Sequence, residues 1–315
     1  MKIGFIKPNY PFEKRVALFP EQIRRSTNVF VVEKGFGEYL DIDDEKYREA
    51  GATLLERAEV FEQCNVIFSL KLIQPSDYES LREGHVIAGW THPTGSGVEF
   101  MKRQAIPKKL VIIDFDNIYP SVYYDGNSYS IPFIPSNFIY KNSYLAGRCS
   151  VMHALLCYGK LPDSNTKAAV LSAGNVAQGA FNVLSLFNAD VRLFSRKTMP
   201  MFLQSLSEWD IIVSGIEMDD PDEHLLSLEQ QKQLKKGCLV IDAAANALHT
   251  FEGLEYGTIG DPIVVKNNVY WYCVNNAPSL LFRDSSVVVS EAFERVFYRE
   301  KDINRFLSLI DHGKR

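Results

Sequence analysis

Hydrophobic and polar positions alternate along the first part of the chain in a regular way. Short runs of β-branched and aromatic residues are separated by segments with apolar residues at helical spacing, and Gly, Pro or Asp bounds them. Strands are predicted over residues 2–6, 29–33, 66–70, 86–90 and 110–114, and helices over residues 44–50 and 76–82. Such alternation is typical of a mostly parallel α/β sheet, which binds ligands at the carboxyl ends of its strands.

This alternation stops at residues 117–142, which are rich in Tyr, Ser, Asn and Pro and are interpreted as an irregular crossing between domains. A second alternation follows a predicted helix over residues 143–158. Its strands are predicted over residues 168–172, 191–195, 211–215 and 238–243, with a helix over about 175–187. The pair Asn267-Asn268 predicts a hairpin between residues 263–265 and 269–274. The tail, residues 285–297 and 303–310, is amphipathic, and its pattern does not decide which domain it covers.

Length and charge narrow the class of protein. With 315 residues, the chain has room for two domains at ~150 residues each. Lys plus Arg is 34 and Asp plus Glu is 39, so the net charge is −5, which argues against a nucleic-acid or anionic-membrane partner. Five scattered cysteines, the lack of an apolar signal segment and the lack of any apolar run near ~18 residues indicate a cytoplasmic protein with a small-molecule partner.

The strongest local motif is AAVLSAGNVAQGAFNVL, residues 168–184, in which an apolar strand leads through a small-residue turn into a helix. Compared with G-x-G-x-x-G/A, Gly174 occupies the second glycine position, Ala177 the third and Ser172 the first, while Gly179 is expected to support close helix–strand contact. The alternative is a packed turn that binds no ligand. The residues predicted to hold a dinucleotide pyrophosphate are Gly174, Asn175 and Val176.

The end of the next predicted strand indicates which dinucleotide binds. An NAD site usually has a carboxylate about 20 residues after the glycines. Here Ser195, Arg196 and Lys197 begin 21 residues after Gly174 (195 − 174 = 21) and include no acid. Cations pair with a 2′-phosphate, and hydrogen bonds to charged groups contribute roughly 1.5–3 kcal/mol each. The sequence predicts NADP(H), unless these residues form an ordinary exposed basic turn.

Three chemically useful side chains follow strands of the first part: Arg15, Lys71 and His92. An Arg and a Lys that converge form a carboxylate receptor, and a His near neutral pH is an acid or base. Each of them alone is more often a solvated or structural residue. The position of all three after predicted strands favours a substrate site. The sequence predicts no metal site. Glu13, Asp114 and Asp116 are candidates to hold the α-ammonium of a second amino acid, or else they belong to the solvated surface.

Five segments carry a resemblance to a known family: KPNYPFEKRVAL (residues 7–18), IFSLKLIQP (67–75), GWTHP (89–93), SAGNVAQGAF (172–181) and VNNAPSL (274–280). Over essentially its whole length the chain resembles the alanine dehydrogenase/transhydrogenase superfamily. Within it, the similarity is strongest to members that use NADPH to reduce the imine formed between pyruvate and the side-chain amine of ornithine. The resemblance implies a homo-oligomer.

The resemblance also implies an architecture and residue roles. It implies two Rossmann-like, doubly wound parallel α/β domains with a cleft between them. The substrate domain would comprise residues 1–142 and 285–315, and the NADP-binding domain residues 143–284. Arg15 and Lys71 would hold the carboxylate and carbonyl of pyruvate, His92 would donate the proton, and Asn276 would lie near nicotinamide and substrate.

Two departures from the family pattern leave alternatives open, and the first is Ser172 in place of the first glycine. The superfamily has an acid four residues after Asp242, where this chain has Asn246, which would contact the cofactor but carries no charge. Asp242 itself is interpreted as a structural acid that braces the strand end, and the alternative is that it replaces the missing acid. The expected function is reductive condensation of pyruvate with the side-chain amine of ornithine or lysine. The alternatives are an NADP-dependent amino-acid dehydrogenase that uses ammonia and an NADP-binding sensor with impaired catalysis.

Overall fold

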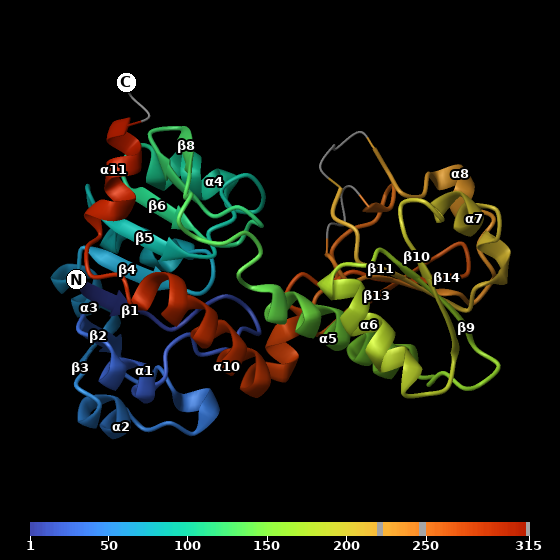
Figure 1. Cartoon of the computed structure of the whole chain (residues 1–315), viewed down its shortest axis with the longest axis horizontal. Helices are drawn as coiled ribbons and strands as arrows, with labels where there is room; N and C mark the ends of the chain where they lie inside the picture. The colour runs from blue at the N-terminus through green and yellow to red at the C-terminus, as the bar shows by residue number, and fades with distance from the viewer. Residues whose placement is uncertain (219–222, 246–249, 313–315) are drawn as a thin grey trace. The chain divides into compact units, whose positions relative to one another are not determined.

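The computed structural model describes residues 1–218, 223–245 and 250–312 and divides into two units. Unit 1 comprises Met1–Ile139 and Phe282–Arg315, and unit 2 comprises Tyr140–Leu281 (Figure 1). Each boundary lies three residues from the one expected. The C-terminal segment, which the sequence pattern left unassigned, belongs to unit 1. No helix among these described residues is long and apolar enough to cross a membrane.

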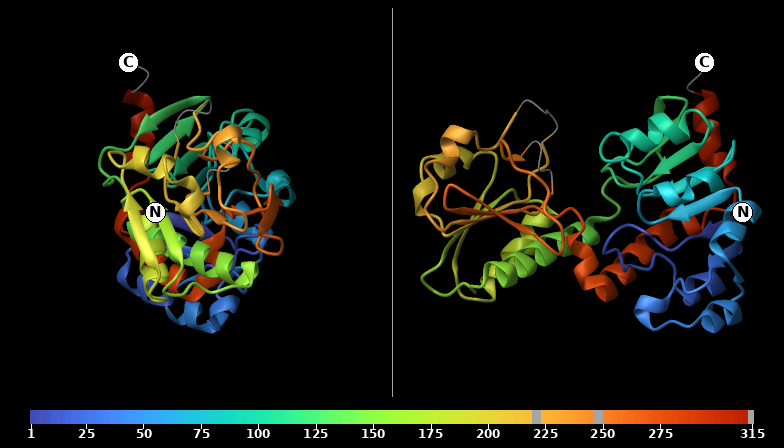
Figure 2. Two further views of the ribbon diagram at one scale, coloured as in Figure 1. Left: turned by 90° about the vertical axis from the view of Figure 1, so that its right-hand side faces the viewer. Right: turned by 180° about the vertical axis from the view of Figure 1, so that it is seen from behind.

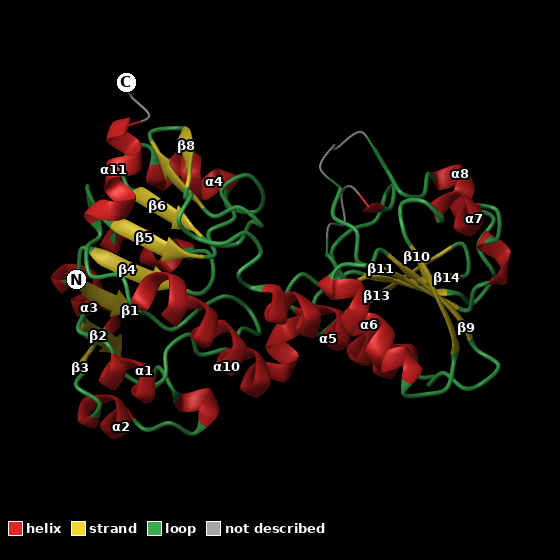
Figure 3. Cartoon of the chain, in the orientation of Figure 1, coloured by secondary structure: helices red, strands yellow, loops and turns green. Residues whose placement is uncertain are grey.

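Unit 1 is built on one eight-stranded sheet in the order β3-β2-β1-β4-β5-β6-β7-β8 (Figure 3). Strands β1 to β6 pair in parallel, and β7 and β8 continue the sheet in antiparallel fashion. The strands are β1 (Lys2–Phe5), β2 (Val29–Glu33), β3 (Thr53–Leu55), β4 (Val66–Ser69), β5 (Val86–Gly89), β6 (Val111–Asp114), β7 (Ser121–Tyr124) and β8 (Asn127–Ser130). The chain leaves β1 in both directions along the sheet, so the switch of strand order lies between β1 and β4.

The interpretation of residues 117–142 as an irregular crossing is therefore wrong in part. This segment contains β7 and β8, joined by Asp125 and Gly126 with φ of 48° and 78°. Positive φ at both central residues is the I′ geometry that Asp-Gly favours in hairpins. The Tyr, Ser and Asn content obscured a turn signal that the sequence does contain.

Helices cover both faces of this sheet. They are α1 (Pro20–Arg25), η1 (Glu38–Leu40), α2 (Asp44–Glu49), α3 (Arg57–Gln63), η2 (Pro75–Ser80), α4 (Val98–Phe100), η3 (Met101–Ala105), α10 (Phe282–Phe293), η6 (Glu294–Tyr298) and α11 (Asn304–His312). Because side chains alternate across a strand, Phe68 packs with α10 and η6, whereas its neighbour Ile67 belongs to the buried cluster on the other face, which includes residues of α3 and α4. In Figures 1 and 2, α11 lies against strands of unit 1 that are far from it in sequence.

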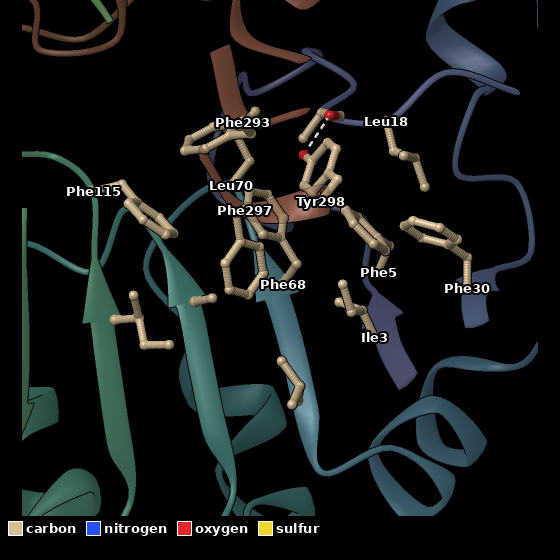
Figure 4. Close-up of a cluster of buried hydrophobic side chains, with 14 of the residues drawn as sticks. Ile3, Phe5, Leu18, Phe30, Phe68, Leu70, Phe115, Phe293, Phe297 and Tyr298 are labelled. Atoms are coloured by element: carbon tan, nitrogen blue, oxygen red, sulfur yellow. Dashed lines mark hydrogen bonds between the residues drawn. The ribbon is translucent and has the colours of Figure 1, made fainter. Parts of the chain in front are cut away.

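The C-terminal segment also positions the loop that follows β1. The Tyr298 hydroxyl donates a hydrogen bond to the Ala17 carbonyl at 2.6 Å, and the Ser286 hydroxyl accepts one from the Val16 amide at 2.8 Å. Figure 4 shows Tyr298 beside the buried ring of Phe5. This loop carries candidate site residues, so the last helices of the chain stabilise its conformation.

Unit 2 has a six-stranded sheet in the order β10-β9-β11-β12-β14-β13, parallel except for the β13–β14 hairpin. The strands are β9 (Lys167–Leu171), β10 (Asp190–Phe194), β11 (Ile211–Ser214), β12 (Leu239–Asp242), β13 (Ile263–Lys266) and β14 (Val269–Tyr272). The helices are α5 (Tyr140–Tyr158), α6 (Asn175–Ser185), α7 (Met199–Leu203), η4 (Leu206–Glu208), α8 (Leu228–Gln231) and η5 (Ala277–Leu281). The predicted hairpin turn is confirmed, since Asn267 and Asn268 have φ of 55° and 60°.

Two glycines allow α5 and α6 to pack closely. A Cβ at Gly147 would lie 1.9 Å from the Val176 carbonyl oxygen, and one at Gly179 would lie 2.0 Å from the Tyr144 carbonyl oxygen. The expectation that Gly179 supports helix–strand contact is wrong, because it faces a second helix. That role belongs to Gly215 after β11, where a Cβ would lie 2.8 Å from the Ala177 amide nitrogen.

We expect Gly179→Ala to lower the free energy of unfolding by about 1–3 kcal/mol or more, because backbone of α5 must move to admit the methyl group. Gly95→Ala is the matched control, since a Cβ there would meet only one atom, 4.0 Å away. Denaturant unfolding followed by circular dichroism measures both variants. Equal stability of the two variants would contradict the close packing of α5 against α6.

Candidate active site

In unit 1, the candidate residues lie after neighbouring parallel strands. Arg15 is in the loop after β1, Lys71 follows β4, His92 follows β5 and Asp116 follows β6. The carboxyl ends of parallel strands share one edge of a sheet, and a switch of strand order opens a crevice there. The structure thus brings the three predicted residues of unit 1 to the same edge of the sheet.

Arg15 forms a buried ion pair with Glu13, two residues before it. Arg15 Nε donates to Glu13 Oε1 at 2.8 Å and Nη2 donates to Oε2 at 2.6 Å, while both residues are at most 3% exposed. Burial raises the pKa of the Glu13 carboxyl, but the charge and hydrogen bonds of Arg15 outweigh it and hold that pKa below its usual value. The guanidinium carbon also lies 5.0 Å from the centre of the Trp90 ring. Glu13 and Trp90 therefore hold the cation in one orientation.

Lys71 also packs against the Trp90 ring. Its Nζ lies 5.7 Å from the centre of the Trp90 ring and 5.4 Å from that of Tyr10, and the residue is 7% exposed. Burial and the nearby charge of Arg15 lower the pKa of the Lys71 amine from 10.5 to about 8, although Glu13 and Asp116 oppose the shift. A substantial fraction of this amine is neutral at mildly alkaline pH.

His92 pairs with a carboxylate that lies after the neighbouring strand. Its Nδ1 lies 2.6 Å from Asp116 Oδ2. Desolvation raises the pKa of Asp116, but the charge and hydrogen bond of His92 outweigh it and lower that pKa below its usual value. An ionised carboxylate only accepts hydrogen bonds, so Nδ1 carries the proton and Nε2 is the nitrogen that can exchange a proton with a substrate. His92 has φ of 47°, and the Gly95 and Gly97 amides bond to its carbonyl.

Asp114, at the end of β6, organises both halves of this pair. Its Oδ1 accepts from the Thr91 amide (2.9 Å), the Thr91 hydroxyl (2.8 Å) and the His92 amide (3.3 Å). Its Oδ2 accepts from the Asp116 amide (3.4 Å) and the Asn117 side chain (3.2 Å). Complete burial, followed by the charge of Asp116, raises the pKa of Asp114 to about 6. Asp114 is a positioning residue for the His92–Asp116 pair.

This arrangement bears on the three acids considered for an α-ammonium group. Glu13 and Asp114 are buried and already bond to internal donors, so the structure does not support that role for them. Asp116, with its side chain 32% exposed, is the acid that solvent reaches, and it pairs with His92. Two roles were not predicted from the sequence: the packing of Arg15 and Lys71 against Trp90, and the hydrogen bonds by which Asp114 positions His92 and Asp116. The apolar run that ends in Asp114 was the available signal for a buried acid at that strand end.

In unit 2, the β9–α6 turn has the backbone that a dinucleotide site requires. Ser172, at the first glycine position, has φ of 98°, a conformation that favours glycine, and its hydroxyl accepts from the Gly174 amide at 3.1 Å. Gly174 is exposed, and a Cβ there would approach only the Ser172 hydroxyl, at 3.5 Å. Asn175 and Val176 form the first turn of α6, where amides point toward a bound anion.

The basic turn follows β10, which lies beside β9 in the sheet. Ser195 and Thr198 close it: the Ser195 amide donates to the Thr198 hydroxyl at 2.9 Å, and the Thr198 amide donates to the Ser195 carbonyl at 3.0 Å. Arg196 and Lys197 between them are exposed, and among the described residues neither forms an ion pair. Their charges are therefore available to an anionic ligand.

Two family models match the chain. That for "Alanine dehydrogenase/PNT, N-terminal domain" matches residues 6–121, and that for "Alanine dehydrogenase/PNT, C-terminal domain" matches residues 168–304. The chain belongs to the alanine dehydrogenase/PNT family. It is therefore an oxidoreductase that binds a nicotinamide cofactor. The β9–α6 turn and the exposed cations after β10 are the features of this alanine dehydrogenase/PNT chain that fit such a cofactor.

Full-length relatives refine the likeness within the alanine dehydrogenase/PNT family. A protein of Clostridium botulinum named N(5)-(carboxyethyl)ornithine synthase is 52% identical over 310 residues, which cover 98% of each chain. A protein of Lactococcus lactis with the same name is 47% identical, again over 98% of each chain. A solved L-alanine dehydrogenase aligns with a TM-score of 0.79 and 16% identity, over 100% of this chain and 93% of that one, which shows the fold.

The remaining predicted residues of this alanine dehydrogenase/PNT chain lie in unit 2. Asn276 is 3% exposed and directly precedes η5, and its carbonyl accepts from the Ser279 amide at 3.0 Å. Asn246 lies outside the described residues. Asp242, at the end of β12, is fully buried, and its Oδ1 accepts from the Ala245 amide at 3.1 Å, a contact that fits a structural acid.

We expect Lys71→Met to stabilise the fold while it removes a site residue. The pKa of Lys71 is about 8 when folded and near 10.5 when unfolded, so the buried charge costs up to about 3 kcal/mol at pH 7. Above pH 8 the folded amine loses its proton and the cost shrinks, so the advantage of Met is largest below pH 8 and disappears near pH 10.5. Denaturant unfolding between pH 7 and 10 measures this, with exposed Lys102→Met as the control. A destabilised Lys71→Met at pH 7 would contradict the expectation.

Proposed function

We propose that this chain condenses pyruvate with the side-chain amine of ornithine or lysine and reduces the resulting imine with NADPH, which yields an N-(1-carboxyethyl) amino acid, NADP⁺ and water. The observation that carries the proposal is the cluster at one edge of the unit 1 sheet, where an Arg–Lys pair lies on a shared aromatic surface near a His–Asp pair. The name N(5)-(carboxyethyl)ornithine synthase, borne by relatives at 47–52% identity, supports this substrate pair.

Arg15 and Lys71 would bind the oxoacid. A guanidinium held by a buried carboxylate is a rigid receptor, because Glu13 engages Nε and Nη2 and fixes the plane of the group. A short oxoacid with its carboxylate toward Arg15 would have its carbonyl within reach of Lys71, because Arg15 lies close enough to Lys71 to lower the pKa of its amine. Both positive charges also favour the neutral form of an incoming amine, which is the form that attacks a carbonyl.

His92 would move the proton that lets water leave. Asp116 holds Nδ1, so Nε2 can donate to the carbinolamine oxygen and recover a proton from solvent, because the side chain is 28% exposed. The Asp114 hydrogen bonds maintain this orientation. When bound, the reduced nicotinamide supplies a hydride to the imine carbon.

Arg196 and Lys197 would select NADPH. An acid at the end of this strand would bind the 2′-hydroxyl of NAD, whereas here two exposed cations follow β10. A 2′-phosphate brings a doubly charged acceptor to these side chains. NADH has a 2′-hydroxyl at this position and offers these two cations no negative charge to bind.

We expect Arg196→Ala to weaken NADPH binding about tenfold or more and the Arg196→Ala/Lys197→Ala pair about a hundredfold, while NADH affinity changes by less than about threefold. Fluorescence titration of both dinucleotides measures this. Lys236→Ala, an exposed cation elsewhere in unit 2, is the matched control. Equal loss of NADPH and NADH binding would contradict selection by the 2′-phosphate.

We expect NADPH oxidation in the presence of pyruvate with ornithine or lysine, and a product in which one carboxyethyl group has replaced a hydrogen of the side-chain amine. Ammonia in place of the amino acid serves as the comparison, because it supports an alanine-type dehydrogenase. Turnover with ammonia but with neither diamino acid would overturn the proposed function. NADPH binding without turnover in any of these mixtures would overturn it as well.

A further inference from the structure

We propose that Lys71 is a covalent catalyst: its amine forms an imine with the 2-oxoacid, and the acceptor amine then displaces Lys71 from that carbon. The substrate imine would thus arise by exchange between two amines. This inference rests on the proposed function, because it concerns the same oxoacid in the same site.

The surroundings of Lys71 suit a nucleophile better than a permanent cation. Within the described part of the chain, its Nζ forms no hydrogen bond and no ion pair, although two carboxylates lie near enough to act on it electrostatically. Those carboxylates have other partners: Glu13 binds Arg15 in two places, and Asp116 binds His92. A lysine that only balanced a charge would be expected to pair directly with one of them.

In the described ranges, two aromatic rings, and not a carboxylate, contact the Lys71 amine. The rings of Tyr10 and Trp90 lie 5.4 and 5.7 Å from Nζ. Aromatic faces orient the side chain through its apolar stem and its charge without accepting its proton in a strong hydrogen bond. The lone pair is therefore available once the proton leaves.

The charges that face Lys71 explain why the proton leaves near neutral pH. These are Arg15 and Glu13 from the loop after β1 and Asp116 from the loop after β6. Burial and Arg15 together prevail over the two acids, and the pKa is about 8. About a tenth of the amine is then neutral at pH 7, against less than about a thousandth for an ordinary lysine. Lysines activated by burial beside a second cation form imines with carbonyl substrates.

Arg15 would also place the reacting carbon. Its guanidinium carbon lies 5.0 Å from the centre of the Trp90 ring that Lys71 shares. In a 2-oxoacid the carbonyl carbon is bonded directly to the carboxylate carbon. Arg15 also lies close enough to Lys71 to lower the pKa of its amine. A carboxylate bound to Arg15 would therefore bring the carbonyl carbon toward Nζ, where addition requires contact at about 3–3.5 Å.

The atoms balance without any external reagent. The Lys71 lone pair adds to the carbonyl carbon, one proton passes from nitrogen to oxygen, and His92 gives the second proton that lets the oxygen leave as water. The product is a protonated imine with a C=N bond to Lys71. The neutral acceptor amine adds to this carbon and passes a proton to the Lys71 nitrogen. The bond to Lys71 then breaks, which leaves the substrate iminium and a neutral lysine.

Reductive trapping tests this step without amine substrate or NADPH. The full chain is incubated with pyruvate and cyanoborohydride, and intact mass followed by peptide mapping locates any carboxyethyl group. We expect one group, at Lys71, with an initial labelling rate that rises about fivefold between pH 7 and 8 as the amine loses its proton. Lys71→Met should lose this label, whereas exposed Lys102→Met should keep it.

A second measurement follows the oxygen that leaves. Imine formation and its reversal exchange the carbonyl oxygen of pyruvate with water, so the chain should accelerate uptake of labelled oxygen from solvent above the uncatalysed rate. Lys71→Met should abolish that acceleration. Denaturant unfolding of the variant at pH 7 verifies that unit 1, which contains residue 71, is folded.

The outcomes separate this inference from the proposed function. Turnover with pyruvate and ornithine, but with neither a label at Lys71 nor oxygen exchange, overturns the covalent step and leaves the function intact. A label at Lys71 without turnover on either diamino acid supports the covalent step and overturns the function. Label spread equally over exposed lysines overturns the covalent step.

Discussion

Parallel pairing of β1, β4, β5 and β6 is the constraint on which the substrate site depends. In-register pairing sets Gly89 at the end of β5 beside Asp114 at the end of β6, and Ser69 at the end of β4 beside Gly89. The loops that follow these four strands therefore all start from the same edge of the sheet. Arg15 and Trp90 are more than 70 residues apart in sequence, yet the guanidinium carbon lies 5.0 Å from the centre of the ring. No local feature of the chain could bring them together.

This edge of the sheet is held in conformations that a stable fold would not select. Lys71 and Asp114 are buried with pKa values moved toward the neutral form. His92 adopts a positive φ without being a glycine, and so does Ser172 in the dinucleotide turn of unit 2. Such costs are typical of functional sites, where pre-organisation requires strain or desolvation. The extensive aromatic core between the unit 1 sheet and the C-terminal helices offsets them (Figure 4).

The return of the chain to unit 1 links the last residues to the first loop. Ser286 and Tyr298 bond to the backbone of Val16 and Ala17, immediately after Arg15. The guanidinium is thereby fixed from two sides, by Glu13 within its own loop and by helices more than 260 residues further along the chain. The substrate part of the protein is therefore complete only when the whole chain is present, even though the dinucleotide motif lies in a separate unit.

The sequence by itself determined the α/β alternation, the strand–turn–helix motif at Gly174, the basic turn at Arg196 and the family. These are local patterns, in which period and turn chemistry act over a few residues. The hairpin at Asp125 was also encoded locally, but the polar composition around it concealed the signal. The structure corrected that interpretation without any need for long-range information.

Only the tertiary structure decided which groups pair and which pKa values shift. Glu13 could have served a substrate, yet burial commits it to Arg15. Gly179 could have faced a strand, yet it faces α5. Lys71 is an ordinary lysine in sequence and becomes a weak base because burial and a neighbouring cation disfavour its charge. Desolvation and Coulomb energies depend on distances across the fold, which sequence spacing does not contain.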